Sequence, residues 1–331
     1  MATRRLPAYS GATVPDLHRV PVASTPPSRF LRRRKPPFAA VQGVKRSSAL
    51  LCALLVAVLP ICAASQPAPS MRIISLLPSL TEDLFALGAG TEVVGVSQYS
   101  DHPDAARAIP RVSSADSIDA EKILTLHPDL VVGIPSQAAM VAPLRRAHLH
   151  VVLLHDDTFD DIYATLHQLG ALIGRPQAAA QLEQHMRAVT AQLLRGVSSG
   201  SRPSVFVVLD VTPIYTVGTK SYINTLIEMA GGRNAAKLGT AYARYSAETL
   251  LADQPDVLIV DPAVGFRSVE DREPWRSLYA VRTGHVAEIA DAEALLSPGP
   301  RYNDGLKWLI AVIRRVQDGP ARHSDNPGSH S

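Results

Sequence analysis

Short apolar runs alternate with amphipathic stretches along the chain after residue 71. The runs most typical of strands are 72–77, 92–97, 129–134, 150–155, 204–210, 256–262 and 284–289. They show no alternation of polar and apolar positions, which is typical of strands buried on both faces in a parallel sheet. The pattern therefore predicts an α/β fold.

The stretch between residues 159 and 197 has helical periodicity and no strand signal. Its second half opens at Pro176, and proline is tolerated in the first turn of a helix. One apolar stripe follows at helical spacing: Leu182, Met186, Val189 and Leu193. A helix of about 20 residues there is about 30 Å long. We therefore predict an N-terminal α/β lobe at 72–156, a helical linker at 157–200 and a C-terminal α/β lobe at 203–318.

The first helix is expected directly after the run at 72–77. Ser79 and Glu82 have the Ser-x-x-Glu spacing of a capping box, and Gly88 follows the last apolar position. These signals predict a helix that starts near Ser79 and ends before Gly88.

Two segments far apart in the chain resemble each other. "AEKILTLHPDL" at 120–130 and "AETLLADQPDV" at 247–257 both have Ala-Glu, an apolar helical stripe, Pro-Asp and then a strand. A duplicated helix–strand unit predicts two similar lobes that face each other. Clefts between such lobes are where small ligands bind.

The most apolar run, 49–64, has no charge and holds 16 residues. A bilayer span needs about 20, whereas a basic pair in front and small residues behind are typical of a secretory signal peptide. We predict that signal at 44–65 and export to the periplasm. A core helix is disfavoured by Pro60, and a lipoprotein signal at Cys62 by the bulky residue before it.

Residues 1–43 are rich in proline and arginine and lack hydrophobic periodicity, so we expect them to be disordered. Because a signal peptide normally stands at the true N-terminus, translation is expected to start near Val44. The tail at 319–331 is expected to be disordered as well.

Removing residues 1–65 changes the charge of the protein. The whole chain has a net charge of +3, whereas the remainder holds 23 basic and 29 acidic residues and has a net charge of −6. This balance argues against a nucleic-acid partner, which needs clustered positive charge.

Cys52 and Cys62 are the only cysteines, so the mature chain has no thiol nucleophile. No nucleotide-binding or nucleophile-elbow motif occurs, and a secreted hydrolase is the alternative of a different class.

Four segments in one order resemble the iron-siderophore/cobalamin family of periplasmic substrate-binding proteins. They are "RIISLLPSLTEDLFALGAGTEVVGVSQYSDHP", "AEKILTLHPDLVV", "SYINTLIEMAGGRNAAK" and "SPGPRYNDGLKWL". The resemblance covers about residues 72–317, and the stretch at 99–103 is most similar to the cobalamin-binding branch. It implies two Rossmann-like α/β lobes with mainly parallel sheets, joined by one long backbone helix. It also implies a monomeric, non-enzymatic protein that delivers a metal chelate to an ABC permease dimer with its ATPase.

Glu121 and Glu248 occupy equivalent places in the repeat, after the expected helix caps Asp119 and Ser246. Acidic residues at helix N-termini gain from the helix dipole, which accounts for one such residue. The duplication suggests a two-fold partner as well. The resemblance implies that both glutamates meet arginines on the two permease subunits.

The ligand site is expected beyond the carboxyl ends of the parallel strands. The candidate ligand-binding residues are Ser79, Tyr99, His155, Tyr215, Trp275 and Arg301. The resemblance implies that Tyr99 lies against a corrin, and Tyr215 offers a second flat face. Arg301 either faces an anionic group of the ligand or caps a helix. Ala115 and residues 133–135 stand where the cobalamin branch often has tryptophan, so a cobalamin precursor, haem and a ferric siderophore remain alternative ligands.

Histidines 148, 150 and 155 are close in sequence but are not expected to converge, because only the last follows the carboxyl end of a strand. No zinc-type spacing of cysteine and histidine occurs. We therefore expect no protein-only metal site and no cofactor besides the transported ligand. The acidic stretch at 156–161 is expected to begin a helix.

Overall fold

The structure, a computed structural model, describes residues 71–198 and 200–319, which fall in one unit. The predicted signal peptide, the leading segment and, apart from residue 319, the predicted tail lie outside these residues. Among the described residues, no helix is long and apolar enough to cross a membrane.

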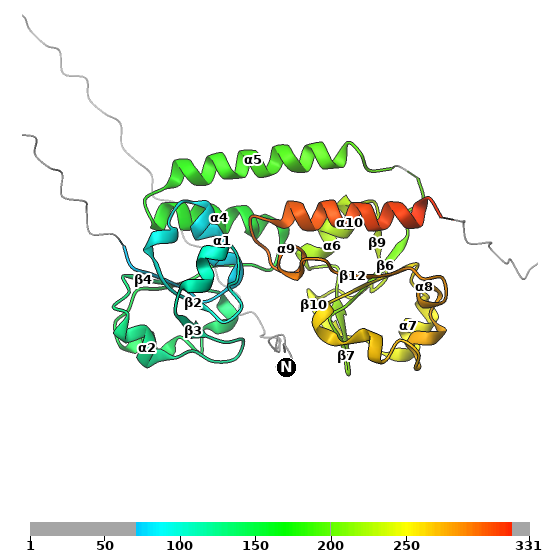
Figure 1. The fold of residues 1–331 in the computed structure, drawn as a ribbon, viewed down its shortest axis with the longest axis horizontal. Coiled ribbons are helices and arrows are strands. Elements are labelled where there is room, and N and C mark those ends of the chain that lie inside the picture. Colours follow the sequence, from blue (N-terminus) through cyan, green and yellow to red (C-terminus); the bar gives the residue numbers. More distant parts are fainter. Residues whose placement is uncertain (1–70, 199, 320–331) are drawn as a thin grey trace, which may run out of the picture. The chain divides into compact units, whose positions relative to one another are not determined.

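The N-terminal lobe is built on a five-stranded parallel sheet in the order β3-β2-β1-β4-β5 (Figure 1). Its strands are β1 (Ile73–Ser75), β2 (Val93–Ser97), β3 (Arg111–Ser113), β4 (Leu130–Gly133) and β5 (Val151–Leu153). Its helices are α1 (Pro78–Ala86), α2 (Ala120–Thr125) and α3 (Ala142–Arg146). The strand order reverses at β1, which creates a switch point where loops from neighbouring strands diverge and leave room for a ligand.

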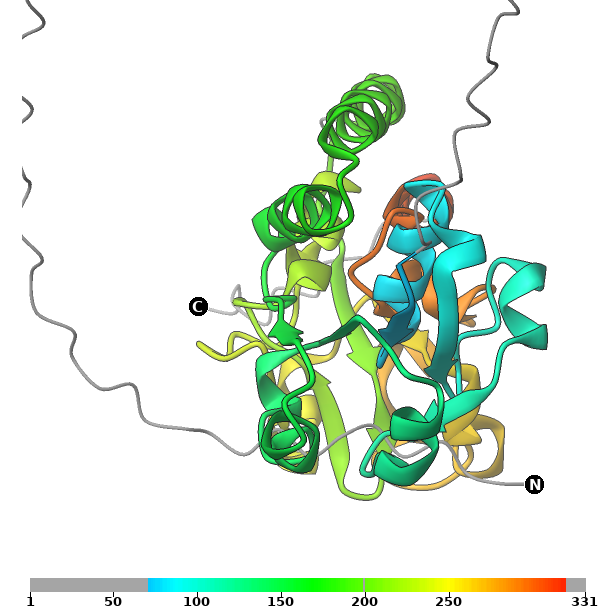
Figure 2. The same cartoon turned by 90° about the vertical axis from the view of Figure 1, so that its left-hand side faces the viewer.

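Two consecutive helices follow, α4 (Phe159–Leu172) and α5 (Pro176–Leu194). The longer, α5, has 19 residues and packs on α4 and on the last helix of the chain (Figures 1 and 2). The predicted linker therefore contains the long backbone helix that the sequence pattern indicates.

The C-terminal lobe combines a parallel and an antiparallel sheet. The parallel sheet has the order β12-β11-β6-β9, and the antiparallel sheet has the order β10-β8-β7. The strands are β6 (Ser204–Val208), β7 (Asp210–Val211), β8 (Ile214–Val217), β9 (Arg233–Asn234), β10 (Tyr242–Arg244), β11 (Val257–Val260) and β12 (Val286–Glu288). The helices are α6 (Tyr222–Met229), α7 (Ala247–Asp253), α8 (Tyr279–Arg282), α9 (Ala292–Leu296) and α10 (Tyr302–Gln317).

The sequence repeat has a direct structural counterpart. In the N-terminal lobe the Asp129 carboxylate accepts a hydrogen bond of 2.8 Å from the backbone N–H of Arg72, just before β1. In the C-terminal lobe the Asp256 carboxylate accepts one of 2.7 Å from the backbone N–H of Ser204, at the start of β6. Each Pro-Asp pair thus fixes the strand it precedes against the first strand of its lobe.

The start of α1 differs from the prediction. The helix begins at Pro78, with Leu77 as its N-cap and no side-chain capping bond. The capping-box prediction is wrong because Pro78 takes the first helical position, which places Ser79 inside the first turn. Glu82 is instead buried and bound by an arginine of the other lobe. The predicted end is confirmed, since Gly88 follows the helix in the left-handed region at φ 77°.

A buried polar cluster joins the linker helices to α10. The hydroxyl groups of Tyr163 and Tyr302 lie 2.6 Å apart, and Thr190 lies 2.6 Å from the same Tyr302 hydroxyl. Phe159 packs edge-on against both tyrosine rings. Because a buried hydroxyl needs a partner, this cluster fixes the mutual positions of α4, α5 and α10.

Candidate functional site

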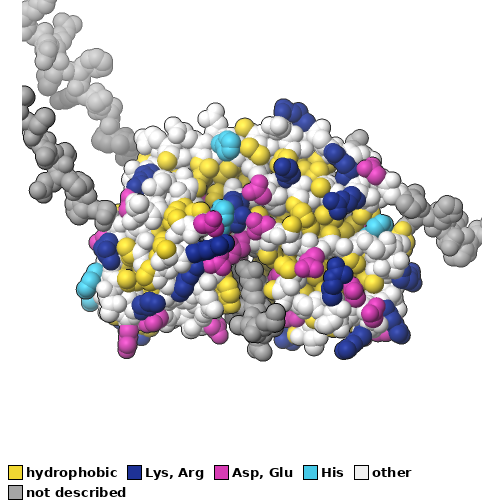
Figure 3. Space-filling view, in the orientation of Figure 1, with side chains coloured by type: hydrophobic (Ala, Val, Ile, Leu, Met, Phe, Trp, Pro, Cys, Tyr) yellow, Lys and Arg dark blue, Asp and Glu magenta, His cyan; other side chains and the backbone are white. Residues whose placement is uncertain are grey.

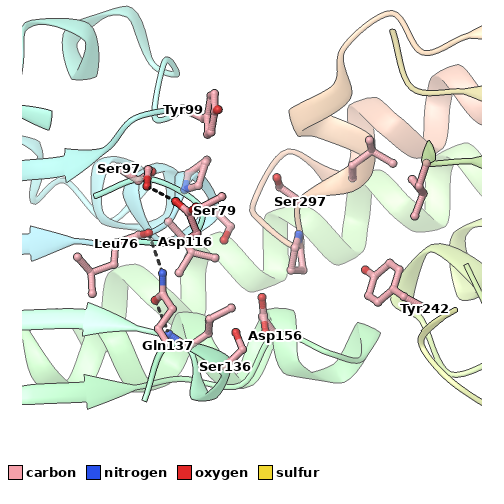
Figure 4. A pocket seen from close by; sticks show the side chains of 18 of the residues that line it. Leu76, Ser79, Ser97, Tyr99, Asp116, Ser136, Gln137, Asp156, Tyr242 and Ser297 are labelled. Atoms are coloured by element: carbon pink, nitrogen blue, oxygen red, sulfur yellow. Dashed lines mark hydrogen bonds between the residues drawn. The ribbon is translucent and has the colours of Figure 1, made fainter. Parts of the chain in front are cut away.

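A cavity of about 420 Å³ opens where the carboxyl ends of the N-terminal strands face the C-terminal lobe (Figure 4). Its volume is in the range of small-molecule sites. The N-terminal lobe contributes Leu76, Leu77, Pro78, Ser79, Ser97, Tyr99, Ser114, Ala115, Asp116, Ile134, Ser136, Gln137, Met140 and Asp156. The C-terminal lobe contributes Leu209, Tyr215, Ile223, Tyr242, Leu296, Ser297 and Pro298.

A chain of buried hydroxyl groups supports the first wall of the cavity. Thr81, on α1, lies 2.9 Å from the Ser75 hydroxyl and 3.0 Å from that of Ser100. Ser100 in turn lies 2.7 Å from the hydroxyl of Ser97. These bonds connect the ends of β1 and β2 to the first helix, so the loop that carries Tyr99 is fixed from below.

Gln137 supports the floor of the cavity. Its side-chain amide donates to the carbonyl of Leu76 at 3.3 Å and accepts from the backbone N–H of Ile134 at 3.1 Å (Figure 4). The residue is buried at the end of the short helix Pro135–Gln137. It thereby joins the carboxyl ends of β1 and β4, the two strands at the switch point.

Three tyrosines line the cavity. Tyr99 comes from the N-terminal lobe, while Tyr242 lies on the opposite side, on β10 (Figure 4). Tyr215, on β8, also belongs to the C-terminal wall. Burial raises the pKa of the Tyr215 and Tyr242 phenols, so both are neutral hydrogen-bonding groups at physiological pH. Aromatic faces on both lobes suit a flat, polarisable ligand.

The charged lining residues are both acidic. Asp116, in the loop after β3, is exposed and accepts a hydrogen bond from Ser114. Asp156, after β5, is half-buried and points into the cavity (Figure 4). Burial, together with the nearby carboxylates of Asp157 and Asp161, raises the pKa of Asp156 to about 7.

The structure brings Ser79, Tyr99 and Tyr215 together around the cavity, as the sequence predicts. His155 is exposed and does not line it, while the next residue, Asp156, does. The strand β5 ends at Leu153, so the turn that follows directs the aspartate and not the histidine to the cavity.

Trp275 lies in the core of the C-terminal lobe and not at the cavity. Its side chain is 2% exposed and packs edge-on against Phe266, with ring centroids 5.1 Å apart. The prediction that it forms a cavity wall is wrong, because its indole ring belongs to the buried hydrophobic cluster of that lobe, together with Leu258 and Val260 of β11.

Arg301 makes an ion pair between the lobes. Its guanidinium group donates to both carboxylate oxygens of Glu82, at 2.7 and 3.0 Å, and to Asp291 at 2.6 Å. Asp291 is itself the N-cap of α9. Arg301 does not line the cavity, so the prediction that it binds ligand is corrected: its donors are held by carboxylates of the protein. Figure 3 shows acidic and basic side chains gathered between α1 and α9.

Glu121 and Glu248 are exposed in the first turns of α2 and α7. The expected caps are confirmed, since Asp119 accepts from the N–H of Lys122 and Ser246 from that of Thr249. Both helices lie on the side of the unit away from α5 (Figure 1).

The neighbouring histidines do not converge. His148 lies just after α3, and its backbone is in the left-handed region with φ 61°. His150 and His155 lie before and after β5, and both side chains are exposed. Among the residues described, no group of three or more histidine, cysteine or acidic side chains is placed to hold a metal ion. Thr158 and Asp161 form a reciprocal capping box at the start of α4, as expected of the acidic stretch.

Several lining residues escaped the sequence analysis. Tyr242 lies on β10, whose three residues are too few to give a recognisable strand pattern. Gln137 lies three residues after the run at 129–134, and Asp156 directly follows that at 150–155. Both positions could have been found from the rule that ligands lie beyond the carboxyl ends of parallel strands.

Comparison with known proteins places the chain among binding proteins. Residues 73–293 match the periplasmic binding protein family. A vitamin B12-binding protein of Vibrio cholerae is 28% identical over 260 residues, which cover 76% of this chain and 92% of that protein. A substrate-binding lipoprotein of an uncharacterised ABC transporter from Bacillus subtilis is 28% identical over 251 residues, covering 73% and 79%.

Solved structures agree with this match. The periplasmic vitamin B12-binding protein of Vibrio cholerae superposes with a TM-score of 0.66 at 28% identity, covering 76% of this chain and 99% of that one. A periplasmic haem-binding protein from Roseiflexus sp. RS-1 superposes with a TM-score of 0.67 at 28% identity, covering 75% and 99%.

Proposed function

Because the chain belongs to the periplasmic binding protein family, we propose that it is the substrate-binding component of an ABC importer and captures a metal chelate between its lobes. A cobalamin-like corrinoid is the proposed ligand. The observation that carries the proposal is the cavity between the lobes, which has tyrosines on both walls and neutral polar groups at its floor.

The site has the properties of a binding site rather than a reaction centre. A cavity lined by apolar groups, phenols and serine hydroxyls makes many contacts with a flat ligand and orients it through a few hydrogen bonds. The rigid hydroxyl chain beneath Tyr99 keeps this wall in place before a ligand arrives. We infer that the ligand is bound and released unchanged, and that a secreted hydrolase is the wrong class.

Haem is the second candidate ligand. The phenols of Tyr99, Tyr215 and Tyr242 line the cavity, and a tyrosine oxygen is a known protein ligand of haem iron. The similarity to the haem-binding protein of Roseiflexus supports the same alternative.

Delivery of the ligand requires a permease to dock on and export of the protein to the periplasm. We propose that Glu121 and Glu248 dock the protein on the two subunits of an ABC permease. Exposed charges placed symmetrically set the register and the association rate of such a complex. We also propose export to the periplasm by the signal at 44–65, in keeping with the periplasmic and lipoprotein relatives.

Calorimetric titration of the purified protein with cyanocobalamin, and absorbance titration with haemin, test the proposed function. We expect one cyanocobalamin per protein and recovery of the intact ligand after denaturation. If neither chelate binds, the proposed ligand class is wrong. If the recovered ligand is chemically altered, the protein is an enzyme.

A further inference from the structure

The charged residues that line the cavity are all acidic. Of the residues in the described part of the chain that line it, none is lysine, arginine or histidine, whereas two are aspartates. Asp156 and Asp116 both belong to the N-terminal lobe. This wall therefore presents negative or neutral oxygen atoms to whatever enters.

Asp156 is the more deeply placed of the two. It is half-buried and points into the cavity (Figure 4). A carboxylate at a partly dehydrated site gains from a hydrogen-bond donor and is opposed by a second negative charge. Electrostatic interactions there are stronger than in water because the effective dielectric constant is lower.

Two basic residues of the C-terminal lobe, Arg301 and Arg244, contact or pair with residues near the cavity, but neither lines it. Arg301 is held by Glu82 and Asp291. Arg244 is exposed and lies opposite Tyr215 in the pairing of β8 with β10, but does not line the cavity. No compensating cation for an anionic ligand therefore faces the cavity from the residues described.

We propose that Asp156 is a specificity-determining residue, which selects metal chelates that present amide or other N–H donors to the N-terminal wall and rejects chelates that present carboxylates. This inference rests on the proposed function and narrows its ligand class. A corrinoid with amide side arms fits, whereas a haem with both propionates directed at this wall does not. Placing an unpaired charge against the wrong ligand is a general source of specificity.

The protonation of Asp156 gives this selection a pH dependence. Its carboxyl lies near those of Asp157, on its own segment, and Asp161, on α4, and near the Tyr242 phenol on β10. The exposed Asp116 lines the same cavity from the loop after β3. The pKa of about 7 means that the unliganded protein is partly protonated at neutral pH. An N–H donor favours the ionised carboxylate, so affinity for an amide ligand should rise as pH increases through 7.

Two matched pairs of ligands isolate the effect of a carboxylate. One pair is cyanocobalamin and its monocarboxylic acid derivatives, in which one amide becomes a carboxylate. The other is haemin dimethyl ester and haemin. Each ligand is titrated at pH 6 and pH 8 into the wild type, Asp156→Asn and the control Asp160→Asn. Asp160 is exposed and does not line the cavity. Its variant changes the net charge of the protein by the same amount as Asp156→Asn but leaves the cavity unaltered.

For the wild type we expect each uncharged ligand to bind about tenfold more tightly than its carboxylate partner at pH 8, with a smaller difference at pH 6. Asp156→Asn should remove most of this preference and its pH dependence, and Asp160→Asn should keep both. Circular dichroism confirms that each variant is folded. Equal or tighter binding of the carboxylate members, or an unchanged preference in Asp156→Asn, overturns the inference and leaves the proposed function intact. Failure of all four ligands to bind overturns both.

Discussion

Removal of the Arg301 side chain tests how strongly one ion pair joins the two lobes. In the variant Arg301→Met the carboxylate of Glu82, 5% exposed, loses the donors at 2.7 and 3.0 Å that compensate its burial. Breaking a buried pair from one side costs about 3–5 kcal/mol. Because the Arg301 side chain is 19% exposed and its second partner Asp291 is half-exposed, we expect the lower end, about 3 kcal/mol.

A loss of about 3 kcal/mol corresponds to a fall in Tm of about 6–12 °C for a unit of this size. Urea unfolding followed by circular dichroism, with calorimetry for Tm, measures it. Glu82→Leu combined with Arg301→Met removes both charges and should recover most of the loss. The control Arg276→Met breaks an exposed pair with Glu273 and should leave Tm nearly unchanged. A cost below about 1 kcal/mol for Arg301→Met, or a double variant in which the two losses add, would refute this reasoning.

Three further variants address other parts of the structure. Asp83 is fully buried, and one of its carboxylate oxygens has no hydrogen-bond partner among the described residues. Burial and the neighbouring Glu82 raise the pKa of Asp83, so wild-type stability should fall as pH rises above about 4, and Asp83→Asn should raise Tm more at pH 7 than at pH 4. Gly218→Ala would place a Cβ atom 2.2 Å from the carbonyl oxygen of Thr240, and unfolding measurements should show a loss of about 1–3 kcal/mol. The double variant Glu121→Gln, Glu248→Gln should bind ligand normally but lose transport in cells, by more than either single variant, and wild-type docking should weaken with salt. Full transport by the double variant would leave helix capping as the only role of these glutamates.

The parts of the fold that could be predicted are those encoded by local patterns. Strands buried on both faces, such as β4 and β11, are continuous apolar runs that need no tertiary information. The duplicated Pro-Asp pairs could predict the lobe repeat because they have the same structural role. In each lobe the aspartate accepts a hydrogen bond from the backbone at the first strand. The antiparallel strands β7, β8 and β10, and the short parallel strand β9, were missed because two to four residues carry too little periodicity.

The candidate site was predicted in part for the same reason. Tyr99 directly follows a recognisable strand, so the rule for parallel sheets located it. The position of the Arg301 side chain is determined by its ion pair with Glu82, which is 219 residues away in the chain. No local sequence pattern can indicate such a pairing. Trp275 was misassigned because an aromatic residue in a polar segment has the same local sequence whether it lines a cavity or fills a core.

The central claim is that the ligand lies in the cavity between the lobes. Ser136 is exposed and lines that cavity, so Ser136→Trp should fill it without disturbing the core. Ser268, exposed and outside the cavity, offers the matched control Ser268→Trp. We expect calorimetric titration with cyanocobalamin to show one binding site in the wild type and in Ser268→Trp, and an affinity at least about tenfold lower in Ser136→Trp. Undiminished binding by Ser136→Trp would place the ligand elsewhere and contradict the claim.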